Sequence, residues 1–227
     1  MNGILNIDKP AGITSFGVVK KIRYLTGVKK VGHSGTLDPF ATGVLLIFVG
    51  REATRNISKF ANLEKEYYAK IKLGEKTDTA DLTGKIIEKR QIPELSISQI
   101  ETAFKSFIGK IQQIPPMYSA VKKNGIRLYK LARKGETVER KPREIEIKEL
   151  KFQKLEKPFL EFSAVVSKGT YIRTLAEDIA EKLGTIGHLT ELQRMRIGDF
   201  VVEKALNLNE LDKEKIESQM ISIEKIQ

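Results

Sequence analysis

The sequence contains no cysteine and no long hydrophobic run. The lack of cysteine excludes disulfides and thiolate metal sites, and it fits the reducing environment of the cytoplasm. The longest apolar run, residues 44–49, is far shorter than the ~20 residues that a membrane span needs, so we interpret it as a buried strand. The N-terminus has neither a basic start nor a long apolar segment, which argues against a signal peptide. We therefore expect a cytoplasmic protein.

Histidine is also scarce, since His33 and His188 are the only two in the chain. Two histidines without cysteine are a weak basis for a metal site. The segment Thr77-Asp78-Thr79-Ala80-Asp81 lacks the Asp-x-Asp-x-Asp-Gly spacing of a calcium loop, and we interpret it as a turn or a loop wall. No Gly-Lys-Ser/Thr follows the glycine-rich residues 32–43, so they are not a P-loop. The sequence predicts no metal site.

Positive charge is abundant, with a formal net charge of +11 and a pI of about 9.6. This balance favours a polyanionic partner, either nucleic acid or a membrane surface, over a solvated basic surface with no partner. Between Lys122 and Arg143, nine basic residues stand against two acidic ones, which places +7 of the net +11 in one stretch. A solvated surface without a partner would spread its charge more evenly, so the clustering strengthens the case for a polyanion.

Apolar periodicity and turn residues predict helices and strands without an internal repeat. A helix is expected to begin at Thr14 or Ser15 and to end before Gly27. Ser98-Gln99-Ile100-Glu101 is interpreted as a capping box that opens a second helix, which Gly109 closes. Further helices are expected at residues 128–134 and 170–183, and strands at residues 44–49, 67–73, 85–89, 144–152 and 159–167, with 85–89 as the hairpin partner of 67–73. This irregular alternation predicts an α+β fold with a mixed, mostly antiparallel sheet flanked by helices.

The most unusual segment is Gly32-His33-Ser34-Gly35-Thr36-Leu37-Asp38-Pro39, which continues through Phe40, Ala41 and Thr42 to Gly43. Its three glycines permit tight turns and close approach of a ligand to the backbone. Pro39 restricts Asp38 to extended conformations and so fixes its direction. Asp38 is therefore a candidate nucleophile or base. The alternative is a surface turn in which the Asp38 carboxylate bonds its own backbone.

Arg173 and Tyr67 also stand in unusual places. Arg173 falls in the first turn of a predicted helix, where the helix dipole disfavours a cation, and it lies beside the apolar stripe. A buried carboxylate partner or a phosphate would explain it; an exposed, snorkelling side chain is the alternative. Tyr67 lies on the apolar face of its strand, either as a core residue or as an aromatic platform for an extruded base.

Several motifs together resemble one family. Gly32-His33-Ser34-Gly35-Thr36-Leu37-Asp38-Pro39 resembles the signature loop of the TruB-type tRNA pseudouridine synthases, with Ser34 where the family usually has threonine. Other segments that match the family in order are Asp8-Lys9-Pro10-Ala11-Gly12-Ile13-Thr14-Ser15, Lys65-Glu66-Tyr67, Leu73-Gly74 through Thr77-Asp78-Thr79-Ala80-Asp81, Pro115-Pro116-Met117-Tyr118-Ser119-Ala120-Val121-Lys122, and Ser167-Lys168-Gly169-Thr170-Tyr171-Ile172-Arg173-Thr174. The resemblance covers about residues 3 to 200.

The resemblance implies a role for each matching residue. Asp38 would be the catalytic aspartate, Tyr67 the active-site tyrosine under the target base, and Arg173 the arginine that pairs with Asp38. His33 would lie beside the flipped nucleotides. The basic stretch would be an arm that grips the T-loop of tRNA, with RNA-binding candidates Lys122, Arg127, Lys130, Arg133 and Lys134.

The resemblance also implies the organisation of the chain and its reaction. We expect residues 1–227 to form one catalytic domain of the pseudouridine synthase fold, with an RNA-gripping insertion at about 110–145. Bacterial relatives usually continue into a C-terminal PUA-type domain, for which the residues after Phe200 are too few, so that domain is expected to be absent or truncated. Residues 203–227 are expected to form a peripheral strand or helix.

The implied reaction isomerises uridine to pseudouridine in tRNA, and uridine 55 of the TΨC loop is the expected target. It is redox-neutral, so no cofactor is expected, and we expect the protein to act as a monomer. Asp38 could attack the sugar, attack the base, or act as a base at C2′. Two other function classes remain open at this point: an RNA chaperone without catalysis, and a phosphate-binding enzyme that uses the glycine-rich loop. The joint presence of Asp38, Tyr67 and Arg173 favours catalysis, and the missing P-loop lysine disfavours phosphoryl transfer.

Overall fold

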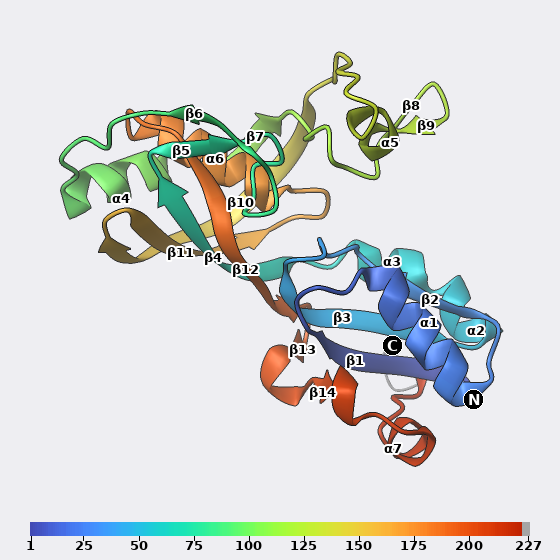
Figure 1. The fold of residues 1–227 in the computed structure, drawn as a ribbon. Helices are drawn as coiled ribbons and strands as arrows, with labels where there is room; N and C mark the ends of the chain where they lie inside the picture. Colours follow the sequence, from blue (N-terminus) through green and yellow to red (C-terminus); the bar gives the residue numbers. More distant parts are fainter. Residues whose placement is uncertain (224–227) are drawn as a thin grey trace. The chain divides into compact units, whose positions relative to one another are not determined.

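The computed structural model describes residues 1–223 and divides the chain into two compact units (Figure 1). Unit 1 comprises residues 1–67 together with the chain from residue 192 onward, and unit 2 comprises residues 68–191. The chain passes from one unit to the other inside two strands, β4 (Lys65–Leu73) and β12 (Gly187–Ile197).

Unit 1 is built on a sheet with the strand order β14-β1-β3-β12, in which β2 also pairs with β3 and β13 with β12. Strands β1 and β3 are antiparallel, whereas β3 runs parallel to β12 and β1 parallel to β14. The remaining strands are β1 (Gly3–Lys9), β2 (Val31–Ser34), β3 (Thr42–Val49), β13 (Phe200–Val201) and β14 (Leu206–Asn207).

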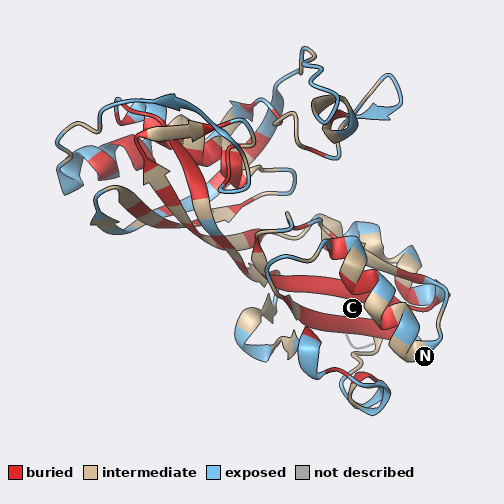
Figure 2. Ribbon diagram, viewed as in Figure 1, coloured by how far each residue is buried: buried red, intermediate tan, exposed pale blue. Residues whose placement is uncertain are grey.

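Helices cover both faces of this sheet. One apolar cluster joins alternate residues of β1 and β3 to α1 (Ser15–Thr26) and α7 (Lys213–Ser218), and a second joins the other residues of both strands to α2 (Arg51–Arg55) and α3 (Ile57–Ala61). Successive side chains of a strand point to opposite faces. A strand covered on both sides therefore reads as one continuous apolar run, which confirms the buried strand predicted at 44–49 (Figure 2).

Helix α1 has the ends that the sequence predicts. The Thr14 hydroxyl accepts a hydrogen bond from the Gly17 backbone N–H, and Gly27 closes the helix with a φ of 69°. A left-handed residue at this position favours glycine, because a Cβ atom would clash with the backbone. Short 3₁₀ turns at Val202–Lys204 and Leu208–Glu210 follow β13 and β14.

Unit 2 contains the sheet order β12-β4-β11-β10-β7 and two separate hairpins, β5–β6 and β8–β9. The strands are β5 (Glu75–Thr77), β6 (Ile86–Lys89), β7 (Gly109–Gln113), β8 (Lys122–Lys123), β9 (Ile126–Arg127), β10 (Arg143–Glu156) and β11 (Phe159–Val166). The helices are α4 (Ile97–Lys105), α5 (Leu128–Ala132) and α6 (Ile172–Lys182). Strand β4 alternates strictly between buried and half-buried residues, as the sequence predicts. Strands β10 and β11 and helices α5 and α6 also lie where the sequence predicts a strand or a helix.

Three sequence expectations are wrong. Residues 86–89 pair with β5 rather than with β4, because β12 and β11 already occupy both edges of β4. The capping box is formed by Ser96 with Gln99, so α4 begins at Ile97, ends at Lys105, and leaves Gly109 to begin β7. The glycine-rich segment is not a continuous loop, since Val31–Ser34 forms β2 along β3.

The remaining predictions concern the membrane and the C-terminal residues. Within residues 1–223, no helix has both the length and the apolar character to cross a bilayer. A peripheral strand or helix was expected at residues 203–227, and the chain forms both there, β14 and α7; residues 224–227 lie outside the described part of the chain.

Candidate active site

Asp38 lies in a tight turn between β2 and β3 of unit 1. The Ala41 backbone N–H donates to the Asp38 carbonyl at 3.1 Å, and the Pro39 carbonyl accepts from the Gly12 N–H at 2.8 Å. The Asp38 side chain is half-buried. The turn is therefore fixed from within and tied to the segment that leads into α1.

Ser15, the first residue of α1, makes a reciprocal contact with the residue before Asp38. Its buried hydroxyl donates to the Leu37 carbonyl at 3.1 Å and accepts from the Leu37 N–H at 2.9 Å. Because both backbone groups of Leu37 are held by one side chain, the peptide that precedes Asp38 has a fixed orientation.

Lys9 holds the other side of the turn. Its ammonium is fully buried at the end of β1 and donates to the carbonyls of Pro10, Ile13 and Pro39 at 2.9, 2.8 and 3.2 Å. Burial lowers the pKa of Lys9 to about 8, although the charge of Asp38 raises it. The protonated form carries three hydrogens for three carbonyls.

Arg194 is a second buried cation beside this loop, and the sequence analysis missed it. It is 1% exposed and lies in β12, a strand that was not predicted. Its guanidinium donates to the Val44 carbonyl at 2.7 Å and the Gly35 carbonyl at 3.0 Å, and one nitrogen lies 3.5 Å from the Tyr67 hydroxyl. It thereby joins the signature loop, β3 and Tyr67.

Two glycines of residues 32–43, Gly35 and Gly43, lie beside Arg194. Gly43 has a φ of 97°, and a Cβ atom there would lie 2.2 Å from the Arg194 carbonyl oxygen. Gly35 has a φ of 73° and would place a Cβ atom 3.4 Å from the guanidinium. Gly43 therefore allows the close approach of the Arg194 backbone, and the left-handed φ favours glycine at position 35. From the sequence, the glycines were expected to admit a ligand instead.

Tyr67 and His33 belong to the same unit. Tyr67 is 8% exposed, as its place on the apolar face of β4 predicts, and its hydroxyl faces Arg194. His33 lies in β2, and its buried Nδ1 has no hydrogen-bond partner among the described residues. Burial, followed by the charge of Arg194, lowers the pKa of His33, which keeps its imidazole neutral.

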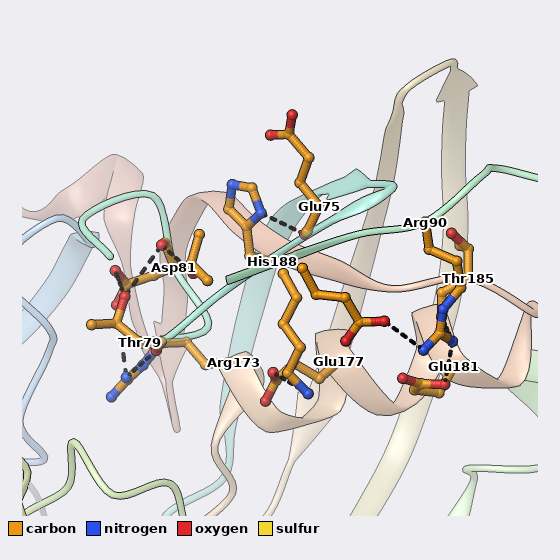
Figure 3. Close-up of polar contacts among 12 residues, drawn as sticks. Glu75, Thr79, Asp81, Arg90, Arg173, Glu177, Glu181, Thr185 and His188 are labelled. Carbon is orange, nitrogen blue, oxygen red and sulfur yellow. Dashed lines mark hydrogen bonds and ion pairs between the residues drawn. The ribbon is translucent and has the colours of Figure 1, made fainter. Parts of the chain in front are cut away.

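Arg173 is held in a buried network of unit 2 (Figure 3). It is 3% exposed, donates to the carbonyls of Thr79 and Tyr118 at 2.8 and 2.7 Å, and lies 3.7 Å from a carboxylate oxygen of Asp81. A snorkelling side chain is thus excluded, and a buried carboxylate partner is present. Asp81 is fixed in turn by the hydroxyls of Thr79 and Thr83.

The basic arm lies between β7 and β10 of unit 2. It consists of the β8–β9 hairpin and α5, where Asn124 and Gly125 form the turn with φ values of 52° and 80°. Buried Leu128 closes the base of the hairpin, because its N–H donates to the Val121 carbonyl at 2.8 Å. All five RNA-binding candidates predicted in this stretch are exposed: Lys122, Arg127, Lys130, Arg133 and Lys134.

The second histidine has a structural environment. His188 is buried in β12, and its Nδ1 lies 2.8 Å from the Glu75 carbonyl (Figure 3). Among residues 1–223, no three histidine or carboxylate side chains gather in a way that could hold a metal ion.

Comparison with protein families now decides the relationship. The family model described as TruB family pseudouridylate synthase (N-terminal domain) matches residues 23–172, which include the Asp38 loop, Tyr67 and the basic arm. The chain belongs to the TruB family of pseudouridylate synthases. A second model, described as the tRNA pseudouridylate synthase B C-terminal domain, matches residues 173–224 of this TruB-family chain.

Two curated relatives match this TruB-family chain over nearly its full length. The tRNA pseudouridine synthase B of Clostridium tetani is 46% identical over 225 residues, which cover 99% of this chain and 78% of the relative. The tRNA pseudouridine synthase B of Francisella philomiragia is 47% identical over 228 residues, which cover 100% of this chain and 75% of the relative.

Solved structures confirm the α+β pseudouridine synthase fold. A chain in the crystal structure of a Cbf5–Nop10–Gar1 complex superposes with a TM-score of 0.72 at 31% identity, over 92% of this chain. A chain of an H/ACA RNP bound to a substrate RNA containing 2′-deoxyuridine superposes with a TM-score of 0.68 at 28% identity. This TruB-family chain spans about half the length of those two chains, 53% and 52%.

Proposed function

We propose that this protein isomerises uridine to pseudouridine in tRNA, at uridine 55 of the TΨC loop. The observation that carries the proposal is the Asp38 turn, fixed by Ser15 and by buried Lys9 in a chain of the TruB family. A turn-forming aspartate would need no such framework. A carboxylate that must meet one atom of a substrate does, because small misplacements of a reacting group cost large factors in rate.

The reaction breaks the C1′–N1 bond of the nucleotide, turns the uracil, and joins C1′ to C5. The proton on C5 is lost and N1 gains one, so the product is an isomer of the substrate. Asp38 supplies the ionised carboxylate on which this rearrangement depends. We propose that Arg173 pairs with Asp38 in the active enzyme, while its contacts with Thr79, Tyr118 and Asp81 orient its guanidinium.

Tyr67 and the basic arm supply binding. Extrusion of the target base costs a few kcal/mol, and stacking on an aromatic ring returns roughly 1–3 kcal/mol per base. We propose that Tyr67 lies under the flipped uracil and that His33 borders the flipped nucleotides. The cations of the arm would contact the phosphates of the T-arm, which adds affinity without reading sequence. We expect the protein to act as a cytoplasmic monomer without a cofactor.

The direct test is incubation of the protein with unmodified tRNA transcripts, followed by base-resolution mapping of pseudouridine. The proposal expects one modified position, uridine 55, and full activity in excess EDTA. A transcript with uridine 55 replaced by cytidine serves as the matched control. No pseudouridine from a folded, tRNA-binding protein would contradict catalysis, and modification elsewhere would contradict the assigned site.

A further inference from the structure

Helix α1 exposes two aromatic side chains and a lysine at helical spacing. Phe16 and Tyr24 are 51% and 87% exposed, and Lys20 lies exposed between them, each four residues from the next. Residues four apart share one face of a helix. The opposite face is buried in the core of unit 1, so in Figure 2 the helix shows red positions beside tan and pale blue ones.

The segment that contains this helix, residues 9–37, carries charge of one sign, although α7, which packs against the helix, also carries Glu214 and Glu217. No acidic residue occurs between Asp8 and Asp38, whereas α1 and the loop after it carry five basic residues. Those residues are Lys20, Lys21, Arg23, Lys29 and Lys30. Within the described residues 1–223, none of the five forms an ion pair with a carboxylate.

The two rings differ in what they face. The cations of Lys20 and Arg23 lie 5.5 and 5.7 Å from the Phe16 ring centre, and Arg23 also donates to the Val31 carbonyl. Phe16 thus fixes two positive charges on the surface through cation–π contacts. Tyr24 is the more exposed ring of the two, and most of its surface is open to solvent.

This face begins beside the catalytic turn. Phe16 follows Ser15, whose hydroxyl holds both backbone groups of Leu37, the neighbour of Asp38. From there the eight residues to Tyr24 extend about 12 Å along the helix axis. The face therefore begins one residue from the side chain that holds the turn proposed to receive the target nucleotide.

We propose that the face formed by Phe16, Lys20 and Tyr24, with Lys29 and Lys30, is a second tRNA-binding surface, separate from the basic arm of unit 2. Its lysines contact phosphates of the strand that leads to the target nucleotide, and Tyr24 stacks on a base or ribose. Interleaved cations and aromatic rings suit a nucleic acid. A protein partner fits less well, because protein interfaces are depleted in lysine. This inference rests on the proposed function.

The test compares two triple variants that remove the same charge. Lys20→Ala/Lys29→Ala/Lys30→Ala changes the proposed surface, and Lys85→Ala/Lys105→Ala/Lys182→Ala removes three exposed lysines of unit 2 that form no ion pair with the described residues. Binding of unmodified tRNA is measured as a function of KCl concentration. The log–log slope should fall by about 0.9 for each phosphate that the first variant no longer binds, and it should stay at the wild-type value in the second.

Tyr24 tests the stacking part. Tyr24→Ala should weaken tRNA binding by about tenfold, within the range expected for one stacked base, while Tyr24→Phe keeps the ring and should bind like wild type. The proposal is overturned if the first triple variant keeps the slope of the control, or if Tyr24→Ala binds like wild type. If the wild-type protein makes no pseudouridine, the proposed function fails, and these binding data still decide whether the surface contacts RNA.

Discussion

The Asp38 turn of unit 1 and the basic arm of unit 2 are built in opposite ways. The turn is tied by the buried side chains of Lys9 and Ser15, and Arg194 holds the same loop at Gly35. The arm is a short hairpin and a five-residue helix whose cations reach solvent. Chemistry on one atom requires fixed geometry, whereas contact with a phosphate backbone tolerates movement. Substitutions in the turn should therefore lower the rate of the chemical step, and substitutions in the arm should weaken binding.

Arg173 is the hardest case for this difference between the turn and the arm. It lies in unit 2, as the arm does, but its side chain is buried, as those of Lys9 and Ser15 are. Arg173→Ala should lower single-turnover pseudouridine formation by about 10³-fold, the scale expected for an essential group. Combining it with Asp38→Asn should be barely worse than either change alone, because residues that act as a unit are not additive. Multiplicative rate defects in the double variant would show that Arg173 and Asp38 act independently.

Arg194 sharpens the comparison within unit 1. Arg194→Met leaves the carbonyls of Val44 and Gly35 without their donor and loosens the signature loop. We expect single-turnover rates at saturating protein to fall by about 10²-fold, as a displacement of about 1 Å does. Arg196→Met is the control, since Arg196 lies on the same strand but pairs with partly exposed Glu64 and Glu66. Equal rates in the two variants would mean that Arg194 does not position the site.

The arm should respond through affinity. Lys130→Ala/Arg133→Ala/Lys134→Ala should lower the log–log salt dependence of tRNA binding by about one for each phosphate that the arm no longer binds. Saturating protein should then recover most of the single-turnover rate. A large rate defect that persists at saturation would show that the arm takes part in the chemical step and not only in binding.

The smallest effect that we expect is on the stability of the fold, and it arises from Asp178 of α6. Burial, followed by the neighbouring charge of Glu177, raises the pKa of Asp178 to about 6. The folded state then binds a proton more tightly than the unfolded chain, so this stabilisation is complete below about pH 4 and is lost as the pH rises through about 6.

Asp178→Asn should therefore raise Tm at pH 7.5 by roughly 2–4 °C. That is the shift given by about 1 kcal/mol in a chain of this size, with the effect discounted for the partial exposure of the carboxylate. At pH 4 the substitution should change Tm much less. Melting curves at the two pH values measure the difference, and equal shifts at both would refute the assigned protonation.

Helices and strands can be predicted from the sequence where a single local pattern determines which of their residues are buried or where they end. Strand β4 alternates because one of its faces is buried, and α1 carries both of its cap residues. Strand β12 could not be predicted, because its first three residues are all buried and its two halves belong to different units. Overlapping Ser-x-x-Gln and Ser-x-x-Glu patterns placed the capping box two residues late, at Ser98 rather than Ser96.

The candidate site was predicted through its signature residues but not through their supports. Asp38, Tyr67 and Arg173 stand out locally, whereas Lys9 and Arg194 act through contacts with residues distant in the chain. One signal for Arg194 was present, because it shares a strand face with Leu192, and a charged residue at such a position needs a buried partner.

We propose that the Asp38 carboxylate performs the chemistry, and the substitution Asp38→Asn is the decisive test. Asparagine keeps the size and turn-forming ability of aspartate but lacks its charge. The measurement is single-turnover pseudouridine formation on unmodified tRNA, with thermal melting and tRNA binding as controls. We expect the rate to fall by at least ~10³-fold in a folded variant whose tRNA affinity is kept or raised. A folded Asp38→Asn protein with a near wild-type rate would show that Asp38 is a turn residue and not a catalytic group.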